Sequence, residues 1–174
     1  MALNPPIRNI VLIGMPGAGK STVGVILAKM AAMGFVDTDL LLQASEGRSL
    51  QEIVDEEGFM ALRAIEERVL LGLDLQGHVI ATGGSAVYSE AAMEHLKGSG
   101  VVVFLDAAAE TLERRIHDFT TRGIARRPDQ SFAELYGERL ALYRRYADIR
   151  IDCAGLTQEA VCGRIILALD GGKA

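Results

Sequence analysis

Runs of apolar residues alternate along the chain with segments whose apolar residues recur at helical spacing. Five short runs have the character of strands, at residues 7–14, 33–39, 78–84, 100–106 and 148–152. The first run, IRNIVLIG, is apolar on both faces, as expected for a central strand that helices cover on each side. Five strands alternating with helices indicate parallel βαβ units. The pattern therefore predicts a doubly wound α/β fold, a three-layer sandwich around a five-stranded parallel sheet.

The helical segments carry recognisable start signals. The apolar positions have helical spacing from Lys20 to Met33. Residues 49–58 and 131–147 each open with a serine that is followed three residues later by a glutamate, the capping-box pattern. Further helices are expected at 59–77, 89–98, 107–119 and 157–172.

Length, composition and charge narrow the class of protein. With 174 residues, 49% apolar and 24% charged, the chain suits one domain, residues 1–174, with a core of useful size. No apolar run approaches the ~18 residues of a membrane span, and no export signal opens the chain, so we expect a cytoplasmic protein without a membrane partner. A net charge of −5 argues against a nucleic-acid partner. Cys153 and Cys162 form no CxxC pair or disulfide framework, and we expect reduced thiols.

A glycine-rich segment, GMPGAGKST, follows the first strand. The pattern G-x-x-x-x-G-K-[ST] is met by Gly14, Gly19, Lys20 and Ser21. Glycines let backbone N–H groups turn inward around a phosphate, and the helix that begins beside Lys20 directs its positive dipole end there. We expect Lys20 to reach the β- and γ-phosphates and Ser21 to bind the Mg2+ that bridges them. A turn that only caps a helix is the alternative, but the position between a buried strand and a helix favours ATP or GTP binding.

Several classes of nucleotide-binding protein remain to be separated. A GTPase switch normally carries an Asn-Lys-x-Asp segment that reads guanine, and this chain has none. A motor or helicase ATPase needs a larger core and partner-binding extensions than 174 residues allow. A small phosphotransferase remains.

Two carboxylates follow the second strand, at the sheet edge where ligands of open α/β folds bind. Asp37 and Asp39 can both face one cleft if the strand ends between them. One would then hold the Mg2+ shell, and the other would orient or accept the proton of an attacking hydroxyl. A solvated turn in which an Asp caps the next helix is the alternative. Arg63, three residues before Glu66, is by itself explained by an intrahelical ion pair.

The succession of motifs resembles one family. GMPGAGKST, DTD, GFMALRAIE, VIATGGSAV, TRG and ERLALYRRYAD follow one another over roughly residues 8–155, as in the shikimate kinases of the nucleoside-monophosphate-kinase-like P-loop group. The resemblance implies a P-loop NTPase fold, ATP and Mg2+ as cofactors, and phosphorylation of shikimate to shikimate 3-phosphate in aromatic amino acid biosynthesis. It also implies an acceptor-binding helical segment at about residues 40–75. We expect a monomer.

The resemblance further implies roles for single residues. Asp37 supports Mg2+, and Asp39 holds the acceptor hydroxyl, ready to deprotonate it. Arg63 and Arg139 grip the shikimate carboxylate, since a guanidinium is planar, always charged and suited to bidentate contact. The backbone of Gly83 and Gly84 lines the same pocket, and nucleotide contacts are expected from Gly14, Gly17, Ala18, Gly19, Lys20, Ser21, Thr22, Arg122 and Gly155.

The basic loop TTRGIARRPDQ falls where the family has a lid, at about residues 119–131. Arg122 matches the arginine that reaches the transferring phosphate, which leaves Arg126 and Arg127 as additional charge. Closure of such a lid excludes water and brings positive charge to the phosphoryl oxygens. An exposed basic loop without such a role is the alternative.

Two departures from the family concern the acceptor side. The usual three glycines are replaced by Gly83, Gly84 and Ser85, and Arg122 is followed by Gly-Ile-Ala rather than Pro-Leu-Leu. Ser85 is strained if the position requires a positive φ, and otherwise adds a hydroxyl to the pocket. Another hydroxy acid such as homoserine therefore stays open as the acceptor, as does a non-catalytic nucleotide-binding regulatory module.

Overall fold

A five-stranded parallel sheet forms the centre of the molecule. The computed structural model describes residues 9–116 and 123–171, and within these ranges the strands are β1 (Asn9–Ile13), β2 (Gly34–Asp37), β3 (His78–Ala81), β4 (Gly100–Asp106) and β5 (Ile149–Asp152). Their order in the sheet is β2-β3-β1-β4-β5, and every neighbouring pair is parallel. The structure confirms the predicted α/β fold.

Strand β1 lies in the middle of the sheet because it is apolar on both faces. All five of its residues are buried, and Val11 pairs with Ile80 of β3 on one side and with Val102 of β4 on the other. A strand buried in this way directs the loop at its carboxyl end to the centre of the sheet edge, where ligands of such folds bind.

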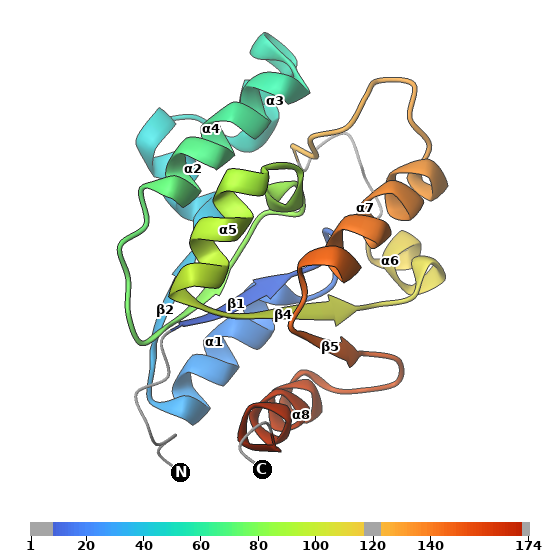
Figure 1. Ribbon diagram of the computed structural model, residues 1–174. Coiled ribbons are helices and arrows are strands. Elements are labelled where there is room, and N and C mark those ends of the chain that lie inside the picture. The colour runs from blue at the N-terminus through green and yellow to red at the C-terminus, as the bar shows by residue number, and fades with distance from the viewer. Residues whose placement is uncertain (1–8, 117–122, 172–174) are drawn as a thin grey trace.

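Helices cover both faces of the sheet. Helix α1 (Lys20–Ala31) packs beside α8 (Gln158–Gly171) on one face, while α5 (Glu90–Ser99) and α7 (Phe132–Tyr146) cover the other (Figure 1). A short helix, α6 (Ala109–Arg115), follows β4. No helix of the described residues is long and apolar enough to cross a membrane.

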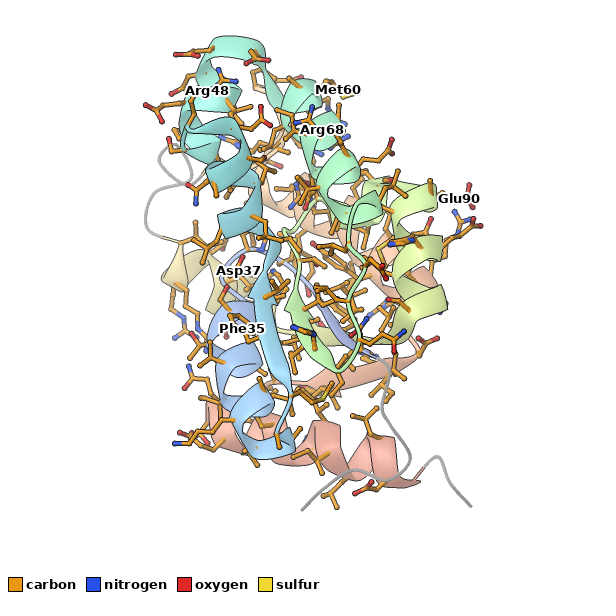
Figure 2. The ribbon with its side chains drawn as sticks, turned by 90° about the vertical axis from the view of Figure 1, so that its left-hand side faces the viewer. Phe35, Asp37, Arg48, Met60, Arg68 and Glu90 are labelled. Carbon is orange, nitrogen blue, oxygen red and sulfur yellow. The ribbon has the colours of Figure 1, made fainter. Side chains whose placement is uncertain are left out.

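Three helices form a separate layer beyond the carboxyl end of β2 (Figure 2). They are α2 (Thr38–Glu46), α3 (Leu50–Glu57) and α4 (Phe59–Leu71). These helices enclose a second apolar cluster, which contains Leu42, Ile53, Leu62, Ile65 and Ala125. Because Ala125 comes from the segment before α7, the helical layer and that segment share one small core.

The structure corrects several predicted boundaries. The second strand ends at Asp37 rather than residue 39, and the pattern did not predict α2, which begins at Thr38. The helix expected at 59–77 ends at Leu71, and the following loop is held by a 2.6 Å hydrogen bond from Asn9 Nδ2 to the Leu75 carbonyl. Apolar residues continue past the end of α4, so periodicity alone extended the helix too far.

Candidate functional site

The loop between β1 and α1 has the backbone of an anion-binding turn. Gly14, Gly17 and Gly19 all adopt positive φ, and a β-carbon at Gly14 would lie 2.8 Å from the Leu105 carbonyl oxygen of β4. Gly19 caps α1 without a side-chain hydrogen bond, and the first turn of α1 contains no acidic residue. The first amide groups of α1 are therefore available to an anion.

Lys20 is held inside this loop. It is 8% exposed, and its Nζ donates to the carbonyls of Gly14 (2.7 Å) and Met15 (3.0 Å). Burial lowers the pKa of Lys20 to about 8, an effect that the nearby Asp39 carboxylate opposes. A buried ammonium group whose partners are mainly carbonyl groups is strongly stabilised by a nearby polyanion.

Ser21 and the carboxylate of Asp37 form a pair of oxygen donors beside the loop. Ser21 Oγ donates to Asp37 Oδ2 at 2.5 Å, and Asp37 Oδ1 accepts from the Asp39 amide at 3.0 Å, which caps α2. Figure 2 shows Asp37 where β2 passes into α2. Mg2+ prefers such oxygen ligands and retains water and phosphate as the others. The pair thus fits Mg2+, and residues 9–116 and 123–171 hold no cluster of three or more His, Cys, Asp or Glu that could bind a metal alone.

A cavity of about 430 Å3 opens next to this loop. Among the residues predicted for the site, its lining includes Gly17, Gly19, Lys20, Ser21, Thr22, Asp39, Gly83, Gly84 and Arg139. Gly14 and Ala18 are buried in the loop itself. The fold thus lines one cavity with residues from the loop before α1, from the segment after β3 and from α2, α4 and α7.

The two predicted carboxylate-binding arginines contact the same carbonyl group, that of Ala125. Arg139 is 1% exposed and donates from Nη2 to the Ala125 carbonyl at 2.8 Å, whereas Arg63 Nη2 lies 3.5 Å from the same oxygen. Arg139 lines the cavity, but Arg63 lines a neighbouring one of about 320 Å3, where its Cζ lies 3.5 Å from the centroid of the Tyr88 ring. The structure therefore brings both guanidinium groups near the site and directs only Arg139 into it.

Glu66 is a cavity residue for which the sequence predicted only an ion pair with Arg63. It is 4% exposed, and its Oε2 accepts a hydrogen bond from Ser85 Oγ. Burial raises the pKa of Glu66 to about 7, while the Ser85 hydrogen bond lowers it. A signal was present in the sequence, because Glu66 is four residues from both Leu62 and Leu70 and so lies on the apolar face of α4.

The carboxylates of Glu66 and Asp39 meet at Gly83. A β-carbon at Gly83 would overlap Glu66 Oε1 and lie 2.8 Å from Asp39 Oδ1. Burial raises the pKa of Asp39, while Lys20 opposes the rise and Asp37 adds to it. Glycine at this position allows two carboxylates to approach the same point of the cavity wall.

The described end of the predicted lid is anchored to the helical layer. The Gly123 amide donates to Gln51 Oε1 at 2.8 Å, and Gly123 has a φ of 58°. Proline, which the family resemblance leads one to expect at this position, is restricted to φ near −65° and does not fit this conformation. Arg126 and Arg127, expected as additional charge, contact the Gln130 carbonyl (2.5 Å) and the Glu138 carboxylate (3.2 Å).

Of two further predicted nucleotide contacts, one lies outside the described residues and the other lies apart from the cavity. Arg122, with residues 119–121 of the predicted lid, lies outside the described residues. Gly155 lies in an exposed turn after β5 and lines neither cavity. On the outer side of the loop, Arg115 Nη1 donates to the Gly17 carbonyl at 3.2 Å, a contact that the sequence did not indicate.

Known proteins share both the sequence and the fold of this chain. A family model described as shikimate kinase matches residues 16–170. The chain is 38% identical over 165 residues to shikimate kinase 2 of Enterobacter sp. (strain 638), and the matched residues cover 92% of this chain and 94% of that protein. It is 41% identical over 152 residues to the shikimate kinase of Gloeobacter violaceus, covering 85% of each. A shikimate kinase from Acinetobacter baumannii, solved in complex with shikimate, superposes with a TM-score of 0.89 at 30% identity, covering 96% of this chain and 95% of that one.

The burial of Glu66 predicts a distinctive pH dependence of stability. The pKa is about 7 in the folded protein against an ordinary 4.5, so between these values the folded state retains a proton that the unfolded state releases. Stability from this group is therefore complete below pH 4.5 and is lost as the pH rises to 7. The unfolding free energy of the wild type should fall relative to that of Glu66→Gln by up to about 1.4 kcal/mol per pH unit.

Urea unfolding of both proteins from pH 4.5 to 8 measures this difference. Glu67→Gln, which removes an exposed carboxylate from the same helix, is the matched control and should follow the wild-type profile. Parallel profiles for the wild type and Glu66→Gln would contradict the assignment of a raised pKa.

Proposed function

The chain belongs to the shikimate kinase family, and from this we propose that it transfers the γ-phosphate of ATP to the 3-hydroxyl of shikimate. One observation carries the proposal: a single cavity joins a phosphate-binding loop, the Asp39 carboxylate and the buried guanidinium of Arg139. This combination suits a phosphate donor on one side and a hydroxyl-bearing carboxylic acid on the other.

The loop from Gly14 to Thr22 is our proposed nucleotide site. Backbone amides of Gly17, Gly19 and the first turn of α1 surround the phosphates, and the Ala18 amide joins them if it leaves the Met15 carbonyl, to which it donates at 3.1 Å. Lys20 exchanges its carbonyl contacts for phosphate oxygens. Mg2+, held by Ser21 and supported by Asp37, supplies positive charge to the β- and γ-phosphates when bound. The absence of any side-chain cap on α1 supports this assignment.

Asp39 is our proposed acceptor-side base. Its carboxylate lines the cavity next to Gly83, and burial raises its pKa, which makes it a stronger base than an exposed aspartate. The acceptor hydroxyl donates to Asp39, and the proton passes to this carboxylate as the oxygen attacks the γ-phosphorus. The bond between the γ-phosphorus and the β,γ-bridging oxygen breaks, and ADP leaves. The backbone of Gly83 and Gly84 lines the acceptor there.

Arg139 holds the carboxylate of the acceptor. Its buried guanidinium lines the cavity, and it keeps one hydrogen bond to the backbone at Ala125. Arg63 supplies the second guanidinium once its longer contact with Ala125 is exchanged for the acid. Two guanidinium groups select an acid over a neutral polyol.

We propose the remaining roles by analogy with the family. Arg122 contacts the transferring phosphate from a lid at about residues 119–131, Gly155 borders the adenine, and residues 40–75 form the acceptor-binding segment. We propose that residues 1–174 act as one catalytic domain, as a cytoplasmic monomer.

The first test is ADP release by the purified protein with Mg-ATP, alone and with shikimate, homoserine or gluconate added singly. Shikimate should raise the rate at least tenfold above the ATP-only rate, because an acceptor must occupy the cavity before transfer. Removal of Mg2+ with EDTA should abolish this increase. ADP release with homoserine or gluconate but not with shikimate would assign a different acceptor. No increase in ADP release with any of the three acids would contradict the proposal.

Substitution of Asp39 distinguishes a kinase from a nucleotide-binding regulatory module. Asp39→Asn keeps the shape but removes the base, so kcat should fall on the order of 10³-fold while the ATP dissociation constant changes less than about threefold. Asp170→Asn, an exposed residue of α8, is the control and should keep wild-type kcat. A variant Asp39→Asn with undiminished kcat would contradict the role of Asp39 as base.

Substitution of Arg139 tests the binding of the acid. Arg139→Ala should raise the acceptor KM about 100-fold with a smaller change in kcat, since charge-assisted hydrogen bonds to the carboxylate are lost. Arg139→Lys keeps the charge but not the planar geometry and should give an intermediate KM. Arg145→Ala removes an exposed arginine of the same helix and should leave KM unchanged. An unchanged acceptor KM in folded Arg139→Ala would mean that another group binds the acid.

A further inference from the structure

Ser85 occupies the position where the family usually has a third glycine, yet its backbone does not need glycine. Its φ is −97°, in the range that ordinary residues adopt, so the serine carries no backbone strain. The side chain is 8% exposed and lines the cavity. What the serine adds is therefore its hydroxyl group.

That hydroxyl is committed to one partner. Ser85 Oγ donates to Glu66 Oε2, across 19 residues of sequence, and both side chains are buried. A hydroxyl donor fixes the rotation of a carboxylate, because the bonded oxygen must stay on the side of the donor. The other oxygen of Glu66 then has a fixed direction.

The free oxygen of Glu66 is directed to the cavity wall. Glu66 Oε1 is buried and has no hydrogen-bond partner among the described residues, although a buried carboxylate oxygen normally has one. It lies at Gly83, on the same side of the cavity as Asp39 Oδ1. A ligand hydroxyl that reaches Asp39 therefore also lies close to Glu66 Oε1, a second acceptor that has no hydrogen-bond donor.

We propose that Ser85 is a positioning residue that holds Glu66 so that its free Oε1 accepts a hydrogen bond from a hydroxyl of the bound acceptor. This inference rests on the proposed function, because it assumes a hydroxylated acid in the cavity.

Without the Ser85 donor, Glu66 can turn toward a positively charged group. Lys20, Arg139 and Arg63 all interact electrostatically with Glu66, and Asp39 repels it. Rotation toward any of these cations would withdraw Oε1 from Gly83, and rotation toward either arginine would also compete with the acceptor's carboxylate for that guanidinium group. Loss of the hydroxyl should thus weaken acceptor binding and leave ATP binding intact.

The experiment measures shikimate binding by calorimetry and steady-state kinetics for the wild type, Ser85→Ala and Ser85→Gly. Both variants lack the hydroxyl, and the φ of −97° suits either residue. We expect the dissociation constant and the KM for shikimate to rise about tenfold in both, with kcat and the KM for ATP within about twofold of wild type. Equal effects in the two variants assign the change to the hydroxyl, and an effect in one alone would overturn the proposal.

A double-mutant cycle tests whether Ser85 acts through Glu66. Glu66→Met retains the bulk of the side chain but offers no carboxylate oxygen. In this background Ser85→Ala should change shikimate affinity less than about twofold, because the partner is already absent. A full tenfold effect in that background would overturn the proposal.

A matched control separates positioning from stability. Ser99→Ala removes the hydroxyl of a part-buried serine, which donates to the Leu96 carbonyl at 2.9 Å near the amino end of β4, far from the cavity. It should lower the melting temperature without a change in shikimate affinity. If Ser85→Ala behaves in the same way as this control, the role is structural and the inference fails. Absence of shikimate binding by the wild type itself would instead reject the proposed function.

Discussion

Four ionisable side chains share one buried region, and their mutual compensation is the constraint on which the site depends. Lys20 and Arg139 are cations, Asp39 and Glu66 are carboxylates, and Lys20, Glu66 and Arg139 are each less than one-tenth exposed. A buried charge without a partner is strongly unfavourable, so each group limits what its neighbours can become. The lowered pKa of Lys20 and the raised pKa of Glu66 are two expressions of the same desolvation.

The fold makes this concentration of charge possible by placing each group on a different element. Lys20 is the first residue of α1, Asp39 lies in the first turn of α2, and Glu66 and Arg139 lie on α4 and α7. Each element is held by its own apolar contacts, so the charges meet without having to stabilise the elements that carry them. The result is a preorganised polar cavity, which is the arrangement that phosphoryl transfer requires.

The Ala125 carbonyl connects the acceptor side of the site to the segment that precedes α7. It accepts hydrogen bonds from Arg139 and Arg63, while the Ala125 side chain belongs to the apolar cluster of the helical layer. Movement of this segment would therefore alter the arginines and the helical layer together. Glu138 of α7 adds a second link to this segment, since its carboxylate accepts hydrogen bonds from both Tyr88 and Arg127.

The sequence by itself determined the parallel sheet, the phosphate-binding loop and the position of Asp37 and Asp39, because these depend on local spacing. An apolar run must be buried, and a glycine-rich turn between a strand and a helix has few other uses. Local spacing did not determine the start of α2, where Asp37 serves as a cap, or the end of α4, where apolar residues continue beyond the helix. Only the tertiary structure decided that Glu66 pairs with Ser85 rather than Arg63, and that Arg139 rather than Arg63 lines the cavity. Those contacts join elements far apart in the chain, and their geometry follows from packing that no local pattern records.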